Sequence, residues 1–197
     1  PPRFAFVRSP AWTHAEPETG EAFAELVQAL GEQASEVELG AAFEPVIDWH
    51  RTIMEVEMAH NLHRDYEQGR DKLSAVLRQL IERGRAHNAV DYVRAVAGVE
   101  PLNEALAPVF DEFDAILTPA APGEAPRGLA STGNPVFCTT WTYLGTPAVT
   151  LPLLSSEAGL PIGVHALFSC DYVQRLRRGA HRLVERLAGE ASELRCS

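Results

Sequence analysis

The first 40 residues alternate between two kinds of pattern, and this order constrains the fold more than any other feature of the chain. Residues 3–8 (Arg-Phe-Ala-Phe-Val-Arg) have the composition of a short strand. Residues 16–33 place apolar side chains at helical spacing, and residues 36–39 alternate again as a strand does. Two strands joined through a helix normally lie parallel, with a crossover connection. The sequence therefore predicts a β-α-β unit over residues 1–40 and an α/β fold.

Helical patterns fill residues 43–113. One long helix is predicted over 43–69, a second over 71–84 that Gly84 ends, and a third over 88–97. The apolar periodicity then breaks and resumes up to residue 113, with a proline that should kink the segment or start a turn. We interpret this block as helices that cover one side of a sheet.

Residues 114–197 differ in composition from the helical block and are rich in proline, glycine and threonine. The elements predicted there are a strand at 115–118, an extended loop over 119–136, a short helix over 136–144, strands at 148–151 and 162–167, and a last helix from Asp171. Together with residues 3–8, these strands should form one mixed β-sheet flanked by helices. Long loops in compact domains are often functional, so the loop is the first place to look for a site.

Charge and cysteine content exclude several classes of partner. The chain has 17 Lys and Arg residues against 27 Asp and Glu residues, a formal charge of −10. An acidic protein is a poor ligand for nucleic acid or for an anionic membrane surface, and no apolar run is long enough to span a bilayer. The three cysteines are far apart, which favours a reducing cytoplasm over a disulfide framework. We expect a cytoplasmic protein that binds neither nucleic acid nor membrane.

Two motifs suggest chemistry but have simpler interpretations. Ser155-Ser156 could supply a nucleophile, yet neither a base nor a glycine-rich oxyanion turn is evident beside it, so a hairpin turn is favoured. Glu57 and His60, with His63 one turn further on, have the spacing of a carboxylate-bridged metal site. Such a site needs a second Glu-x-x-His from another helix, and the sequence has none, so a polar helix face is favoured and no metal is expected.

A cysteine and a lysine are the remaining candidates. Cys138 could act as a thiol nucleophile with His165 or His181, but its neighbours supply no cation, which favours a small buried side chain. Lys72 is the only lysine, and its position at a predicted helix start favours a solvated side chain. The residues alone therefore predict an α/β domain without assigning its chemistry.

The stretch from residue 117 to residue 164 carries a recognisable order of motifs. The segments are Leu117-Thr-Pro-Ala-Ala-Pro122, Thr132-Gly-Asn-Pro-Val-Phe137, Trp141-Thr-Tyr-Leu-Gly-Thr-Pro-Ala-Val-Thr-Leu-Pro152 and Leu160-Pro-Ile-Gly-Val164. This stretch closely resembles the C-terminal part of the amidase signature family. In that family a strand ending in Thr-Pro leads to a Pro/Gly-rich loop, a Leu-Gly-x-Pro-Ala turn and a Leu-Pro-x-Gly-Val strand. Two departures are Cys138, where many relatives carry Asn, and a shorter loop between Leu167 and Asp171.

The resemblance implies an activity whose chemical groups this chain lacks. The family hydrolyses carboxylic amides with a serine nucleophile, a bridging cis-serine and a lysine base, without a metal or other cofactor. Its serines lie in a Gly/Ser-rich signature, and both signature and lysine precede the strand assigned here to residues 3–8. No segment of this chain matches the signature, and Lys72 lies in the wrong context. The resemblance therefore implies a C-terminal portion without catalytic residues, inactive alone, that binds a small amide substrate only in the complete enzyme.

Two alternatives remain beside this interpretation. The chain could be a non-catalytic binding or partner subunit of the same family, paired with a chain that supplies the missing N-terminal part. It could also be an independent thiol hydrolase that uses Cys138. If the chain is a fragment, we expect unpaired sheet edges to make it self-associate.

The resemblance also implies where a substrate would contact this chain. Strand ends in α/β sheets commonly face ligands, and Thr118 ends a predicted strand. The predicted substrate-binding residues are Thr118, Thr132, Gly133, Asn134, Phe137, Thr140 and Trp141. Phe137 and Trp141 share a helical face and could form an apolar wall beside the polar groups, although a place in the core is the favoured alternative for them.

Overall fold

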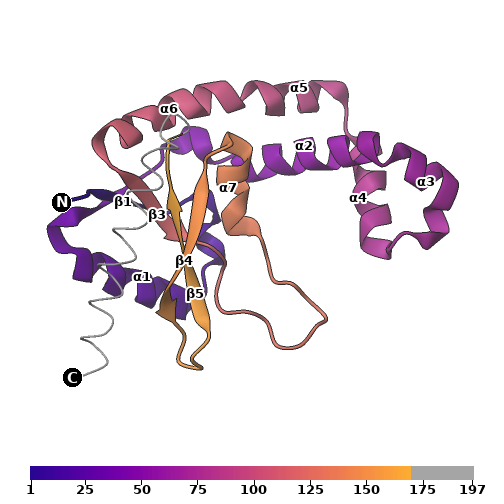
Figure 1. Cartoon of the computed structure of the whole chain (residues 1–197). Coiled ribbons are helices and arrows are strands. Elements are labelled where there is room, and N and C mark those ends of the chain that lie inside the picture. Colours follow the sequence, from indigo (N-terminus) through magenta and orange to yellow (C-terminus); the bar gives the residue numbers. More distant parts are fainter. Residues whose placement is uncertain (170–197) are drawn as a thin grey trace.

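A five-stranded mixed sheet forms the centre of the molecule (Figure 1). The computed structural model describes residues 1–169. The strands are β1 (Phe4–Val7), β2 (Ala34–Val37), β3 (Ala115–Pro119), β4 (Ala148–Ser155) and β5 (Pro161–Leu167), in the order β2-β1-β3-β5-β4. β1 is parallel to β2 and β3, and β5 is antiparallel to β3 and β4. The predicted mixed α/β sheet is confirmed.

The first 40 residues form the predicted parallel unit. Helix α1 (Pro17–Leu30) joins β1 to β2, and β1 pairs with β2 from Phe4 opposite Ala34 to Val7 opposite Val37. The second strand begins two residues earlier than its alternating pattern suggested. Gly31 adopts a positive φ of 53° and ends the helix, and a single 3-10 turn over Gly31–Gln33 then leads into the strand.

Each face of the sheet is covered by helices because successive side chains of a strand point to opposite faces. Phe4 and Phe6 pack with Phe23 of α1 in one apolar cluster, whereas Ala5 and Val7 belong to a second cluster on the other face. The second cluster includes residues of α2 (Val46–Asn61), α6 (Val99–Glu112) and α7 (Val136–Leu144).

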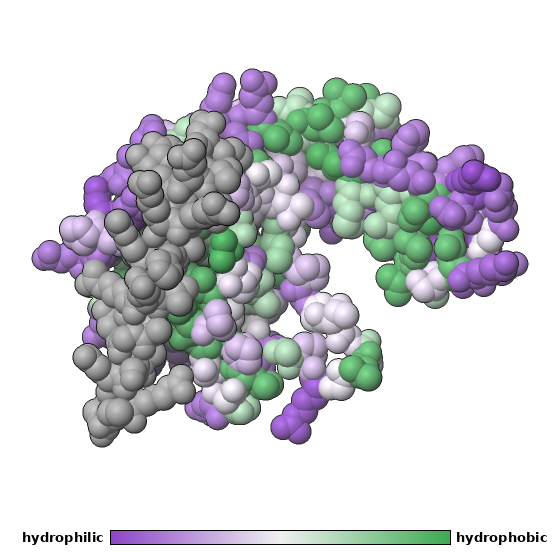
Figure 2. All heavy atoms as spheres, viewed as in Figure 1, coloured by the Kyte–Doolittle hydropathy of each residue, from purple (hydrophilic) through white to green (hydrophobic). Residues whose placement is uncertain are grey.

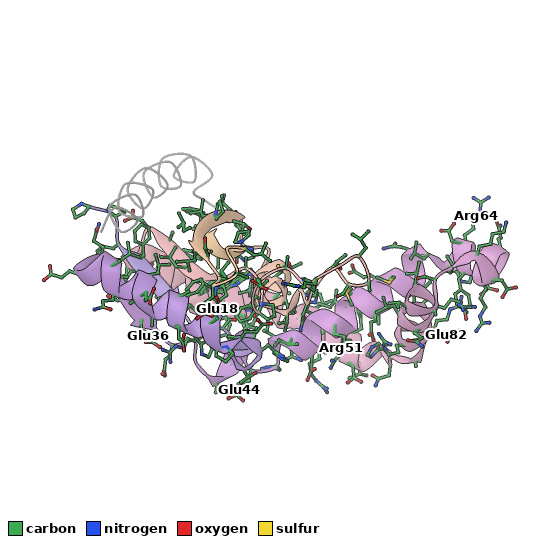
Figure 3. The ribbon with its side chains drawn as sticks, turned by 90° about the horizontal axis from the view of Figure 1, so that it is seen from below. Glu18, Glu36, Glu44, Arg51, Arg64 and Glu82 are labelled. Atoms are coloured by element: carbon green, nitrogen blue, oxygen red, sulfur yellow. The ribbon has the colours of Figure 1, made fainter. Side chains whose placement is uncertain are left out.

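A helical arm, which we define as residues 46–97, projects away from the sheet (Figures 1 and 3). It contains α2, α3 (His63–Gly69), α4 (Ala75–Ala86) and α5 (Ala89–Ala97). In Figure 3, Arg64 lies at the tip of this arm, whereas Glu36 and Glu44 lie near the sheet. None of the helices in the described part of the chain is long and apolar enough to cross a membrane.

Two predictions for the arm are wrong. The single helix over 43–69 is divided, because the backbone leaves helical geometry at Leu62 (φ −98°, ψ 12°) between α2 and α3. Gly84 does not end its helix but lies buried inside α4. A Cβ there would lie 1.9 Å from the Glu55 carbonyl oxygen, so the missing side chain is what lets α4 cross α2 so closely.

The second half of the chain agrees more closely with the sequence. Helix α7 has the predicted bounds, and β4 and β5 form the predicted hairpin, with β4 continuing to Ser155 instead of ending at residue 151. The helix predicted from Asp171 lies outside the described residues. The division of the chain into parts at 1–40, 43–113 and 114–197 stays a prediction.

Candidate functional site

A cavity of about 790 Å³ opens where β3 ends and β5 begins. Its wall comes from the segment before α1, the loop after β3, the approach to α7 and the start of β5. The polar residues of this wall are His14, Glu16, Glu124, Arg127, Thr132 and Asn134. A cavity at the carboxyl end of a strand, with a few polar groups, is the usual form of a small-ligand site.

The start of α1 forms one side of the cavity. The Glu16 backbone N–H donates a hydrogen bond to the Pro122 carbonyl oxygen at 2.8 Å. Gly123 allows the close approach, since a Cβ there would lie 2.1 Å from Glu16 Oε2. The carboxylate is therefore held against the loop at the cavity wall, although more than a hundred residues separate the two segments in sequence.

The β4–β5 turn anchors the same loop from another side. The Ser156 hydroxyl donates a hydrogen bond to the Glu124 carboxylate and accepts one of 3.1 Å from the Leu160 N–H. The Glu157 N–H donates to Glu18 of α1. Ser156 thus belongs to the hairpin turn that the sequence favoured, whereas Ser155 is the last residue of β4, and the buried Ser156 hydroxyl ties the turn to the loop.

Three of the predicted substrate-binding residues lie together at the cavity. Thr132, Gly133 and Asn134 are exposed and line its wall. Gly133 has a φ of 88°, a conformation that favours glycine. The Asn134 Oδ1 accepts a 3.0 Å hydrogen bond from the Val136 N–H at the start of α7, which leaves its amide N–H₂ group available to a ligand.

The other four predicted residues lie in the protein interior, outside the cavity wall. Thr118, Phe137 and Thr140 are 0% exposed and Trp141 is 2% exposed. Phe137 packs with Val136 and Ala11, whereas Trp141 belongs to the cluster on the sheet. The structure therefore separates the predicted set into a cavity group and an interior group, and a role in substrate binding stays a prediction for both.

The sequence pattern does not reveal the charged residues of the cavity. In the sequence, Glu16 belongs to an acidic helix start, which does not indicate a binding site. No local pattern identifies His14, Glu124 or Arg127 as cavity residues. No spacing could have found them, because they meet only through the contact between the loop and α1. The proline and glycine content of the loop was the one available signal.

Residues considered for other chemistry lie apart from this cavity. Lys72 is exposed at the end of a short turn (Arg70–Lys72) on the helical arm. Glu57 accepts a 3.2 Å hydrogen bond from the Tyr92 hydroxyl. Among residues 1–169, no group of three His, Cys, Asp or Glu side chains is arranged to hold a metal ion.

Cys138 is half-buried in α7, and we expect its thiol to react slowly with alkylating reagents. Its Sγ donates to the Ala120 carbonyl oxygen at 3.7 Å, and burial raises the pKa of the thiol, so less reactive thiolate is present at neutral pH. In a Cys170→Ser/Cys196→Ser background, alkylation of Cys138 at pH 7 should proceed several-fold more slowly than alkylation of glutathione. A rate equal to or above that of glutathione would contradict the prediction of a poorly reactive thiol and would favour the thiol-hydrolase alternative.

The fold and the cavity together define an α/β protein with a polar cavity at the strand ends of a mixed sheet. Residues 1–167 match the family model described as "Amidase", and the chain belongs to the amidase family. A curated relative is a glutamyl-tRNA(Gln) amidotransferase subunit of Agathobacter rectalis, which is 28% identical over 97 residues, or 46% of this chain and 19% of the relative.

Three solved structures have the same fold. A crystal structure of an amidase has a TM-score of 0.73 and 23% identity, covering 86% of this chain and 42% of the amidase. A structure of a vestigial protein complex, which bears on the origins of an s-triazine catabolic enzyme, has a TM-score of 0.79 and 20% identity, with 94% and 43% coverage. The 6-aminohexanoate cyclic dimer hydrolase has a TM-score of 0.74 and 18% identity, with 94% and 45% coverage. This chain therefore spans less than half of the length of each of these relatives.

Proposed function

We propose that this chain forms part of the substrate cavity of an enzyme that hydrolyses carboxylic amides. In the complete enzyme a serine nucleophile, a bridging cis-serine and a lysine base would break the amide bond, and all three would come from residues outside this chain. The observation that carries the proposal is the polar cavity at the end of β3, in a chain that belongs to the amidase family. We further propose a cytoplasmic location.

The cavity residues would bind and orient the substrate. The Asn134 amide N–H₂ group can donate to a carbonyl oxygen, because its Oδ1 is already used at the start of α7. The Thr132 hydroxyl can donate or accept, and both residues lie on the same wall. A substrate amide that is held in one orientation by these groups spends more of its time positioned for attack by the serine nucleophile. This raises the rate of the reaction.

The test measures amide turnover by the chain alone and by the chain mixed with a polypeptide that carries the missing signature. Alone, we expect turnover of aryl and aliphatic amides at the uncatalysed rate, because Lys72 is exposed on the arm and Ser156 is held in a turn. Mixed with a polypeptide that carries the Gly/Ser-rich signature, the rate should rise by roughly a thousandfold or more. In that mixture Asn134→Ala should lower kcat/KM about tenfold.

The controls make this test specific. Arg51→Gln changes an exposed residue of the helical arm and should leave kcat/KM unchanged. Amide turnover by the chain alone, abolished by Ser155→Ala or Ser156→Ala, would refute the proposal.

The second candidate is a non-catalytic partner subunit. Two observations favour it: the relatives include a protein complex and an amidotransferase subunit, and α5 exposes Val90, Val93 and Val96 at 64%, 62% and 44%. Figure 2 shows apolar residues over the upper helices and a hollow between the arm and the loop. Exposed apolar stripes of this kind commonly bind another protein.

The two candidates differ in whether the mixture gains amide turnover. If this chain is a non-catalytic subunit, it should bind the chain that holds the signature without raising the amide turnover of that chain, and Val93→Glu should weaken the binding. Self-association is the remaining outcome, and sedimentation of the chain alone measures it.

A further inference from the structure

The first turn of α7 contacts the loop that forms one wall of the cavity. The Val136 N–H donates a hydrogen bond of 3.0 Å to Oδ1 of the cavity residue Asn134. The Cys138 thiol lies 3.7 Å from the carbonyl oxygen of Ala120, which also lines the cavity. A displacement of α7 would therefore displace this wall.

The same turn supports a second wall of the cavity. Phe137 is 0% exposed and packs with Ala11 in the short 3-10 turn Pro10–His14. His14 is the last residue of that turn and lines the cavity, as does Glu16 two residues further on. The loop and the approach to α1 are distant in sequence, and α7 contacts both of them.

The last turn of α7 is anchored to α5. The Tyr143 hydroxyl donates a hydrogen bond of 2.5 Å to the carbonyl oxygen of Ala95. Gly98, which follows α5, makes room for this contact, since a Cβ there would lie 2.6 Å from the Tyr143 hydroxyl oxygen and 2.4 Å from the Trp49 ring. Burial raises the pKa of Tyr143 to about 12, so the hydroxyl keeps its proton and stays a donor at neutral pH.

A second anchor joins the same turn to α6. The Asn103 Nδ2 donates one hydrogen bond to the carbonyl oxygen of Leu144, the last residue of α7, and another to Val99 of its own helix, both at 3.1 Å. The last carbonyl groups of a helix have no partner within that helix, so Asn103 satisfies one of them. The position of this end of α7 is therefore set by two hydrogen bonds from distant helices.

We propose that Tyr143 and Asn103 are positioning residues for the cavity. They fix the last turn of α7, and the helix transmits that position to the two walls that its first turn contacts. Coupling of this kind travels through rigid secondary elements that are packed at both ends. The inference rests on the proposed function, because these walls are the ones that would orient the substrate.

Tyr143→Phe tests the proposal, because it removes the hydroxyl and keeps the ring beside Trp49. The variant should lower Tm by about 2–4 °C, since it removes a buried hydrogen bond. It should also shift the NMR cross-peaks of the Asn134 side-chain amide and the Val136 N–H in the folded chain. Val136 lies about 10 Å from Tyr143 along the helix, too far to sense the lost hydroxyl unless α7 itself moves.

Tyr66→Phe is the matched control. Tyr66 is also buried and its hydroxyl donates a 2.7 Å hydrogen bond to Glu82, but it packs with Ile81 on the helical arm. This variant should lower Tm as well and leave the Asn134 and Val136 cross-peaks in place. If Tyr143→Phe also leaves them in place, or if Tyr66→Phe shifts them equally, the proposal is overturned.

Asn103→Ala is a second variant, which decides the matter if Tyr143→Phe does not fold. It should shift the same two cross-peaks, and unchanged cross-peaks would again overturn the proposal.

Activity gives a further readout, and it separates this inference from the proposed function. In the mixture with the signature polypeptide, Tyr143→Phe and Asn103→Ala should lower kcat/KM several-fold, whereas Tyr66→Phe should leave it unchanged. Unchanged kcat/KM in all three variants would overturn the positioning role. A wild-type mixture without turnover would refute the proposed function instead, and the cross-peaks would still show whether Tyr143 and Asn103 position the cavity walls.

Discussion

Gly84→Ala should lower the free energy of unfolding by about 3 kcal/mol. The new Cβ would lie 1.9 Å from the Glu55 carbonyl oxygen and 2.8 Å from the Ala59 Cβ. Neither neighbour is the free end of a flexible side chain, so α2 and α4 must separate. That separation weakens the contacts of Ile81, which is fully buried between these helices. Urea denaturation followed by circular dichroism measures the change.

Gly20→Ala is the matched control for this substitution. Gly20 also lies inside a helix, α1, but a Cβ there meets nothing within 4 Å. Alanine in an open helical position stabilises a protein by about 0.5–1 kcal/mol relative to glycine. If both variants shift stability in the same direction, the close crossing of α2 and α4 is not what requires glycine at position 84.

Glu55→Gln should have the second large effect, at about 1–2 kcal/mol near pH 7. The Glu55 side chain is 2% exposed, and its carboxylate lies 2.7 Å from Arg83 Nε and 2.9 Å from His87 Nε2. These contacts connect α2 to α4 and to the segment after it. Glutamine keeps the shape of the side chain but loses its charge. The hydrogen bond to Arg83 therefore weakens and no longer offsets the free-energy cost of burying a polar group at this position.

The pH dependence of that difference tests its cause. Burial by itself would raise the pKa of Glu55, but the hydrogen bonds from Arg83 and His87 outweigh it, and the pKa is lowered in the folded protein. A lowered folded-state pKa stabilises the protein above the unfolded value of about 4.3, and this stabilisation disappears as the pH falls through the folded value. The difference between wild type and Glu55→Gln should therefore be present at neutral pH and vanish in acid, as the pH falls through the folded-state pKa of Glu55.

Glu67→Gln provides the comparison. Glu67 forms an ion pair of 2.7 Å with Arg85, but both side chains are solvent-accessible, so its loss should change stability little. An equal loss in the two variants would show that burial of Glu55 does not matter.

The sequence predicted the elements whose signals are local. The apolar strand at 115–118, the short helix at 136–144 and the hairpin near residue 159 each combine a periodic pattern with a proline or glycine boundary, and all three are confirmed. Gly84 misled the prediction because a glycine that ends a helix and a glycine that lets two helices cross look the same in one dimension. The difference depends on the Glu55 backbone, which is distant in sequence.

The candidate site was only partly predictable for the same reason. Thr132, Gly133 and Asn134 lie in a loop whose composition marked it, and they line the cavity. Glu16 joins them only because the loop after β3 packs on the start of α1, a contact that no spacing reveals. Thr118 and Thr140 have the polarity expected of a binding residue, yet their burial follows from the position of α7 over the sheet.

By itself, the sequence determined the fold class, the order of the strands along the chain and the family, because each depends on patterns that repeat over a few residues. Only the tertiary structure decided which strands are neighbours, where the helical arm bends and which polar side chains meet at the cavity. Those arrangements depend on contacts between distant segments, and such contacts exist only once the chain has folded.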